Sequence, residues 1–142
     1  MLYGVGYEQR DLASFVGLLG LHGIRQLVDV RLTPASRKPG FSKTRLSAAL
    51  AEAGIDYCHV SELGNPRDNR DALRAGASSA VRRYRSKLDN GSRHAVRALV
   101  DMAQEQPVAM LCYERVQAEC HRRIIAEVAQ EIDPGLVVIP LE

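Results

Sequence analysis

The sequence has no tryptophan, only three cysteines, and no apolar run long enough to cross a membrane. A membrane-spanning helix needs about 20 consecutive apolar residues, so we expect no membrane partner. The odd number of cysteines, without paired spacing, argues against a disulfide framework and favours a reducing compartment. The first residues lack the basic-then-apolar pattern of a signal peptide, so we expect a cytoplasmic protein. Aromatic residues make up 5% of the chain, which is few for a surface that stacks nucleic-acid bases.

The composition is that of an ordinary globular protein. A length of 142 residues, with 46% hydrophobic and 25% charged residues, predicts one domain over residues 1–142. The net charge of +2 is too small to imply a nucleic-acid partner by itself. Residues 67–97, however, hold eight arginines and one lysine against three aspartates, so this segment is distinctly basic.

Short apolar runs alternate with helical patterns along the chain. The runs predict five strands, over residues 2–6, 26–30, 55–60, 107–112 and 136–140. The intervening patterns predict helices that begin at the capping residues Asp11 and Ser42, and further helices over residues 71–88, 92–106 and 117–132. Strands separated by helices form parallel βαβ units. We therefore expect an α/β fold, with a mostly parallel five-stranded sheet and helices on both faces.

Unusual polar residues follow four successive strands. An open parallel sheet binds its ligands outside the carboxyl ends of the strands, so these residues should meet at one rim. The candidate binding residues are Arg10, Asp29, Arg31, Arg37, Asn65, Arg67, Cys120 and Arg122. Several guanidinium groups around one crevice repel one another, which favours a bound anion near the helix N-termini. The alternative is that each arginine pairs with a nearby acid, as Arg31 could with Asp29.

A second group of residues suggests chemistry. Cys112 ends a buried strand, and Cys120 and His121 begin the inward face of the last predicted helix. A cysteine near a helix N-terminus with basic neighbours should have a lowered pKa. We therefore predict Cys112, Glu114 and His121 as catalytic nucleophile, acid and base. The alternative is structural, with Cys112 finishing a core strand and His121 bonded to the backbone.

The same residue types suit zinc, because Cys112, Cys120 and His121 are all common zinc ligands. Adjacent residues of a helix diverge by roughly 100°, which predicts that Cys120 and His121 do not share one ion. The chain also contains no CxxC pair. We therefore expect no cofactor, with zinc as the alternative.

Four ordered blocks resemble the domain-of-unknown-function family 488 across almost the whole chain. The blocks are Tyr3–Glu8 with Arg10, Val28–Arg31 with Arg37, Leu63–Arg67, and Leu111–Glu114 with Cys120–Arg122. Gly4 stands where a small hydroxyl residue is more usual, and Gln9 stands where many members have glycine. The resemblance implies the same fold and marks the same rim residues, but it implies no reaction.

These observations predict an enzyme that acts on a phosphorylated, nucleotide-like or nucleic-acid substrate held by the arginine-rich rim. One alternative is a non-catalytic nucleic-acid-binding module, in which the basic segment over residues 67–97 follows the phosphates. The other is a domain that senses a metabolite or a metal without chemistry. We therefore expect the partner to be an anionic small molecule or a nucleic acid.

Overall fold

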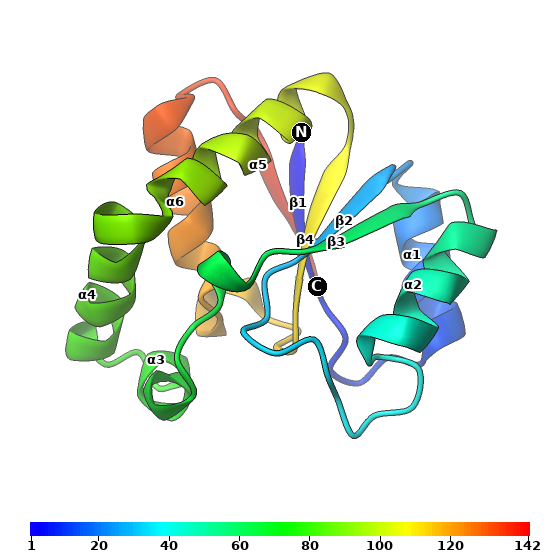
Figure 1. Ribbon diagram of the computed structural model, residues 1–142, viewed down its shortest axis with the longest axis horizontal. Coiled ribbons are helices and arrows are strands. Elements are labelled where there is room, and N and C mark those ends of the chain that lie inside the picture. Colours follow the sequence, from blue (N-terminus) through cyan, green and yellow to red (C-terminus); the bar gives the residue numbers. More distant parts are fainter.

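The computed structural model describes all residues, 1–142, and places five strands in one parallel sheet (Figure 1). The strand order is β3-β2-β4-β1-β5. The strands are β1 (Leu2–Gly6), β2 (Gln26–Asp29), β3 (Asp56–His59), β4 (Val108–Cys112) and β5 (Val138–Leu141). Every neighbouring pair runs parallel, which confirms the predicted α/β fold. β4 lies in the middle of the sheet, and all of its residues are buried.

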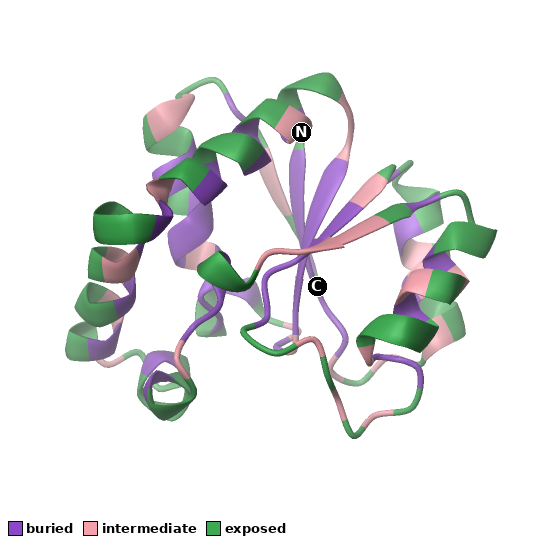
Figure 2. Cartoon of the chain, in the orientation of Figure 1, coloured by how far each residue is buried: buried purple, intermediate pink, exposed green.

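Helices cover both faces of the sheet, as predicted. Figure 1 shows α1 (Leu12–Leu21) and α2 (Lys43–Glu52) on one side. On the other side lie α4 (Ser78–Lys87), α5 (Arg93–Glu105) and α6 (Arg122–Ile132), with the short α3 (Arg70–Arg74) beside them. The buried residues of these helices turn toward the sheet (Figure 2). None of the helices is both long and apolar enough to span a membrane.

Alternation along β4 divides the apolar residues between two cores. Ala109 and Leu111 pack with α1 and α2, whereas Met110 and Cys112 pack with α4, α5 and α6. Successive side chains of a strand point to opposite faces of the sheet. Cys112 is two residues after Met110, so its sulfur lies on the same face as the Met110 side chain. Cys112 therefore points toward the layer that contains α6.

The basic segment differs from the prediction of one helix over residues 71–88. The chain leaves α3 after Arg74 and begins α4 at Ser78, because Gly76 takes a left-handed conformation with φ +81° that ends helices readily at glycine. The predicted break at Asn90 and Gly91 is confirmed, because α4 ends at Lys87 and α5 begins at Arg93. A π-helical turn, Leu88–Ser92, joins α4 to α5 without an extended loop.

The predicted helix over residues 117–132 begins later than expected. Residues Gln117–Glu119 form a 3₁₀ turn, and α6 starts only at Arg122. Between them Cys120 is extended, with φ −125° and ψ 154°. Cys120 and His121 are therefore not consecutive residues of a helix, and the predicted divergence of roughly 100° between their side chains is wrong.

The turn after β1 holds the site-bearing loops together. Gln9 has a φ of +61° and is the one non-glycine residue in the left-handed region; its position is the one where glycine is more usual in the family resemblance. Gly6 lies directly against the chain that follows β4. A Cβ atom at Gly6 would stand 1.9 Å from the carbonyl oxygen of Glu114, so only glycine fits there.

We predict that Gly6→Ala destabilises the fold by about 3 kcal/mol, because the new methyl group meets backbone that cannot move aside easily. Urea denaturation followed by circular dichroism measures the change. Gly17→Ala is the matched control, because a Cβ at Gly17 in α1 meets nothing within 4 Å. That control should gain about 0.5–1 kcal/mol from helix propensity. Equal effects of the two substitutions would contradict the close approach at Gly6.

Candidate functional site

A cavity of about 150 Å³ opens at the carboxyl ends of the strands. Its walls come from the loops that follow β1, β2, β3 and β4, which is the rim expected for a parallel sheet. Of the predicted site residues, the lining includes Arg31, Asn65, Arg67, Cys112, Glu114, Cys120 and His121. The sequence therefore located the region of the cavity, although not every residue assigned to it.

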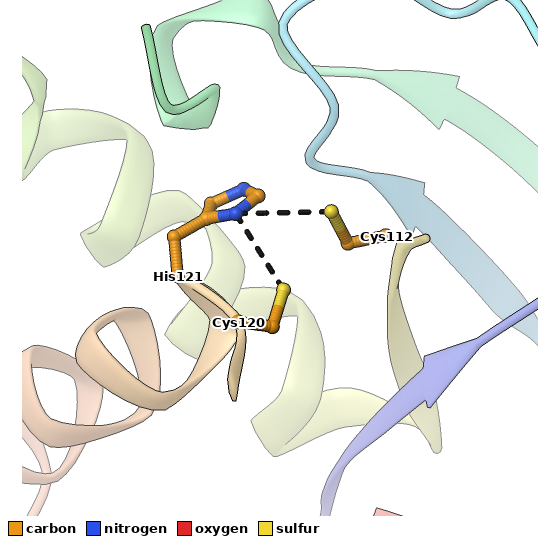
Figure 3. A group of neighbouring side chains, drawn as sticks. All are labelled: Cys112, Cys120 and His121. Atoms are coloured by element: carbon orange, nitrogen blue, oxygen red, sulfur yellow. Dashed lines mark hydrogen bonds between the residues drawn. The ribbon is translucent and has the colours of Figure 1, made fainter. Parts of the chain in front are cut away.

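Cys112, Cys120 and His121 form a buried cluster on one wall of this cavity (Figure 3). The Nδ1 atom of His121 lies 3.7 Å from the sulfur of Cys112 and 3.5 Å from the sulfur of Cys120. These three atoms all lie within 4.8 Å of one another. Figure 3 shows the imidazole edge turned toward both sulfurs.

A backbone contact fixes the orientation of the His121 ring. Its Nε2 atom lies 2.8 Å from the carbonyl oxygen of Val30, directly after β2. A carbonyl oxygen only accepts hydrogen bonds, so Nε2 carries the proton. Nδ1 then faces the sulfurs, as an acceptor when the ring is neutral and as a donor when it is charged.

Arg122 supplies a buried positive charge beside Cys120. Its side chain is completely buried, and no carboxylate oxygen lies within ion-pair distance of it. Its Nε lies 3.3 Å from the Cys120 sulfur, and its backbone N–H lies 3.5 Å from the same atom. A buried cation requires a compensating negative charge. The sulfur of Cys120, as a thiolate, is the group placed to provide it.

The pKa values of the two thiols are shifted in opposite directions. The hydrogen bond to Cys120 and burial raise the pKa of the Cys112 thiol. Burial opposes ionisation of Cys120 as well, but the hydrogen bond from Cys112 and the charges of His121 and Arg122 hold its pKa well below the ordinary value. When Cys112 and Cys120 together hold one proton, the negative charge therefore lies on Cys120.

The same electrostatics act on the neighbouring acid and base. Burial lowers the pKa of His121, but the Cys120 thiolate outweighs burial and the net shift is upward. Burial and the nearby thiolate raise the pKa of Glu114, whose Oε2 lies 3.5 Å from the Cys112 sulfur. Both shifts favour the protonated form of the group concerned.

Arg31 lies at the cavity wall, but its charge is neutralised. Its Nε and Nη2 atoms donate to the two carboxylate oxygens of Asp29 at 2.8 and 2.7 Å. Tyr57 donates to Asp29 as well, at 2.5 Å, and the remaining Arg31 nitrogen donates to the carbonyl of Phe41. This is the pairing that the sequence offered as the alternative to anion binding.

Three other predicted arginines do not line the cavity. Arg10 donates to the backbone carbonyls of Leu141, the last residue of the edge strand β5, and of Glu142, at 3.3 and 2.8 Å. Arg37 is exposed on the loop before α2, and Arg122 lies beneath the cysteines. The five arginines therefore do not form one common rim.

Two arginines at the cavity are free of ion pairs. Arg67 and Arg70 are both exposed, line the cavity, and have no carboxylate partner. Both also line an adjoining hollow with Arg74 and Tyr113. Arg70 was not among the binding residues predicted from the sequence. Its spacing of three residues from Arg67, on the same loop-to-helix segment, is the signal that would have found it.

Asn65 and two arginines of α4 are held in contacts within the fold. The buried Asn65 accepts a hydrogen bond from Asn69 at 3.0 Å. On α4, Arg83 pairs with Asp68 at 2.9 Å and Arg85 pairs with Glu131 at 2.7 Å. The charges expected to follow nucleic-acid phosphates are thus partly occupied by carboxylates.

A family model described as "Domain of unknown function DUF488" matches residues 11–129. The matched segment contains every cavity-lining residue except Tyr7. No curated protein and no solved structure matches the chain.

We predict that Arg31→Met destabilises the fold by about 3–5 kcal/mol, because it leaves the buried carboxylate of Asp29 without its counter-charge. Urea denaturation at neutral pH measures the loss. Arg83→Met breaks an exposed ion pair with Asp68 and should cost less than about 1 kcal/mol. A loss of similar size in both variants would refute the structural role assigned to the Asp29–Arg31 pair.

Proposed function

We propose that this chain, which belongs to the DUF488 family, is an enzyme that acts on a phosphorylated or nucleotide-like substrate with Cys120 as its nucleophile. The observation that carries the proposal is the buried Arg122 guanidinium, whose nearest anionic candidate is the Cys120 sulfur at 3.3 Å. Because both groups lie beside a cavity, the negative charge that Arg122 requires is available to a bound molecule. In this proposal Cys112, which the sequence predicted as the nucleophile, is instead the protonated thiol beside it.

The three polar groups around Cys120 have separable roles. Arg122 and His121 stabilise the thiolate, since both direct N–H groups at its sulfur when the ring is charged. Cys112 stays protonated, in keeping with its raised pKa, and its S–H group donates a hydrogen bond to the Cys120 thiolate. Glu114 lies beside Cys112 and faces the cavity. It is the general acid and base of the proposed reaction.

Arg67 and Arg70 supply the anion-binding half of the site. Their guanidinium groups are suited to bidentate contact with phosphate oxygens, and neither is neutralised by a carboxylate. A cavity of about 150 Å³ has the size of one that holds benzene. It therefore accommodates one phosphoryl group or one ring, while the rest of the substrate lies over the adjoining hollow.

The chemical step is a nucleophilic displacement. The Cys120 thiolate forms a bond to the electrophilic phosphorus, and the leaving oxygen departs with the bonding electron pair and takes a proton from Glu114. Water then attacks the phosphocysteine, and the ionised Glu114 accepts the proton of that water. Cleavage of the S–P bond returns the thiolate, so that protons and electrons balance over the cycle.

Thiol reactivity tests the assignment of the nucleophile. At neutral pH we expect iodoacetamide to modify Cys120 at least about tenfold faster than Cys112 or Cys58, because only Cys120 is a thiolate. Mass spectrometry of peptides from a time course measures the three rates. Cys58 is the internal control, as burial raises its pKa and it stands off the cavity. Faster modification of Cys112 would reverse the assignment.

Turnover tests the function itself, using a panel of phosphate mono- and diesters. We expect Cys120→Ser to lower kcat by at least about a thousandfold while phosphate still binds, and the double variant Arg67→Met, Arg70→Met to raise KM about 10–100-fold with little change in kcat. Arg45→Met is the matched control, because Arg45 is an exposed arginine of α2 away from the cavity. Undiminished turnover by Cys120→Ser would reject the proposal.

A further inference from the structure

We propose that the sulfurs of Cys112 and Cys120 and the Nδ1 atom of His121 form a binding site for Zn²⁺ whose fourth coordination position faces the cavity. The two sulfurs and the ring nitrogen are the ligand types that zinc prefers in proteins. All three residues are buried and all three line the cavity.

The distances among the three atoms are those of one coordination sphere. Tetrahedral zinc with ordinary Zn–S and Zn–N bonds holds a sulfur about 3.6 Å from an imidazole nitrogen. The observed distances from His121 Nδ1 are 3.7 Å to Cys112 and 3.5 Å to Cys120. The sulfurs also lie within 4.8 Å of each other, so a bound ion requires only a small movement of either side chain.

The imidazole is already held in the orientation that a metal needs. The hydrogen bond from Nε2 to the Val30 carbonyl, at 2.8 Å, leaves the lone pair of Nδ1 directed at the space between the sulfurs (Figure 3). Histidine ligands of zinc commonly donate their other ring N–H to a carbonyl or carboxylate, and this contact fixes the tautomer and strengthens binding. Val30 provides that contact.

The backbone explains why neighbouring residues can share one ion. Cys120 is extended and His121 precedes the first residue of α6, so their side chains converge instead of diverging around a helix. Cys112 comes from the central strand β4, which is buried along its whole length. Two thiolates balance the charge of Zn²⁺, and the Arg122 N–H groups at the Cys120 sulfur would stabilise a metal-bound thiolate as well.

Three protein ligands beside a cavity are characteristic of zinc sites that keep an open position. A bound ion would engage both sulfurs, including the nucleophile of the proposed reaction. If that function is correct, zinc is therefore an inhibitor of it, and loading the site with one equivalent should abolish turnover. The binding site itself is independent of the proposed function, because it is inferred from the geometry of the three ligand atoms.

Titration of the chelator-treated chain with Co²⁺, a spectroscopic substitute for Zn²⁺, tests the site. We expect one equivalent to produce thiolate-to-cobalt charge-transfer absorption and the visible bands of tetrahedral cobalt, and Zn²⁺ to displace it. Cys112→Ser, Cys120→Ser and His121→Gln should each weaken binding at least about 100-fold. Cys58→Ser should leave it unchanged. Absence of these bands, or their loss in Cys58→Ser, would overturn the proposal.

Alkylation of the cysteines in the unaltered chain, with and without Zn²⁺, tests the site without relying on variants that fold. One equivalent of Zn²⁺ should slow alkylation of Cys112 and Cys120 at least tenfold and leave Cys58 unaffected, whereas no selective protection would refute the site. Turnover of the metal-free protein is measured separately. Turnover without zinc binding refutes only the metal site, and zinc binding without any turnover refutes only the proposed enzyme.

Discussion

The candidate site depends on one buried cation without a carboxylate partner. Arg122 is completely enclosed, and its Nη1 atom has no hydrogen-bond partner at all. Desolvating a guanidinium is costly unless a negative group lies beside it. Its other nitrogens reach the Cys120 sulfur and the Glu114 carbonyl, so this cation binds the start of α6 to the loop after β4 and favours a charged sulfur between them.

The second constraint is long-range and could not be read from the sequence. His121 reaches the carbonyl of Val30, 91 residues earlier in the chain, because the sheet order places β2 beside β4. Alternating helices and strands predicted the parallel sheet, and that sheet predicted a rim where the polar loops meet. Strand order is what the pattern leaves open. It decides that Arg10 lies near the end of β5 and that Arg31 is enclosed with Asp29.

Local backbone conformation accounts for the other differences from the sequence prediction. The apolar periodicity of α6 extends back toward residue 117, but a 3₁₀ turn and the extended Cys120 interrupt it. The close packing at Gly4 is also invisible in the sequence. A Cβ there would stand 1.7 Å from Oε1 of Gln117, so the Gln117 amide occupies the space that a side chain at position 4 would fill. The two positions are 113 residues apart, and their coupling exists only in the folded chain.

The two proposed uses of the site, nucleophilic catalysis and zinc binding, both require the sulfur lone pairs of Cys120. Without metal, the proposed Cys120 thiolate compensates the positive charges of Arg122 and His121 and is the nucleophile at the cavity. With Zn²⁺, the proton on Cys112 and the proton on Nδ1 are displaced, since zinc ligands must be deprotonated. The ligand atoms need scarcely move between the two states, because both require separations close to those observed. If both proposals hold, proton and zinc activity would therefore govern the selection between thiol chemistry and metal binding, without a change of fold.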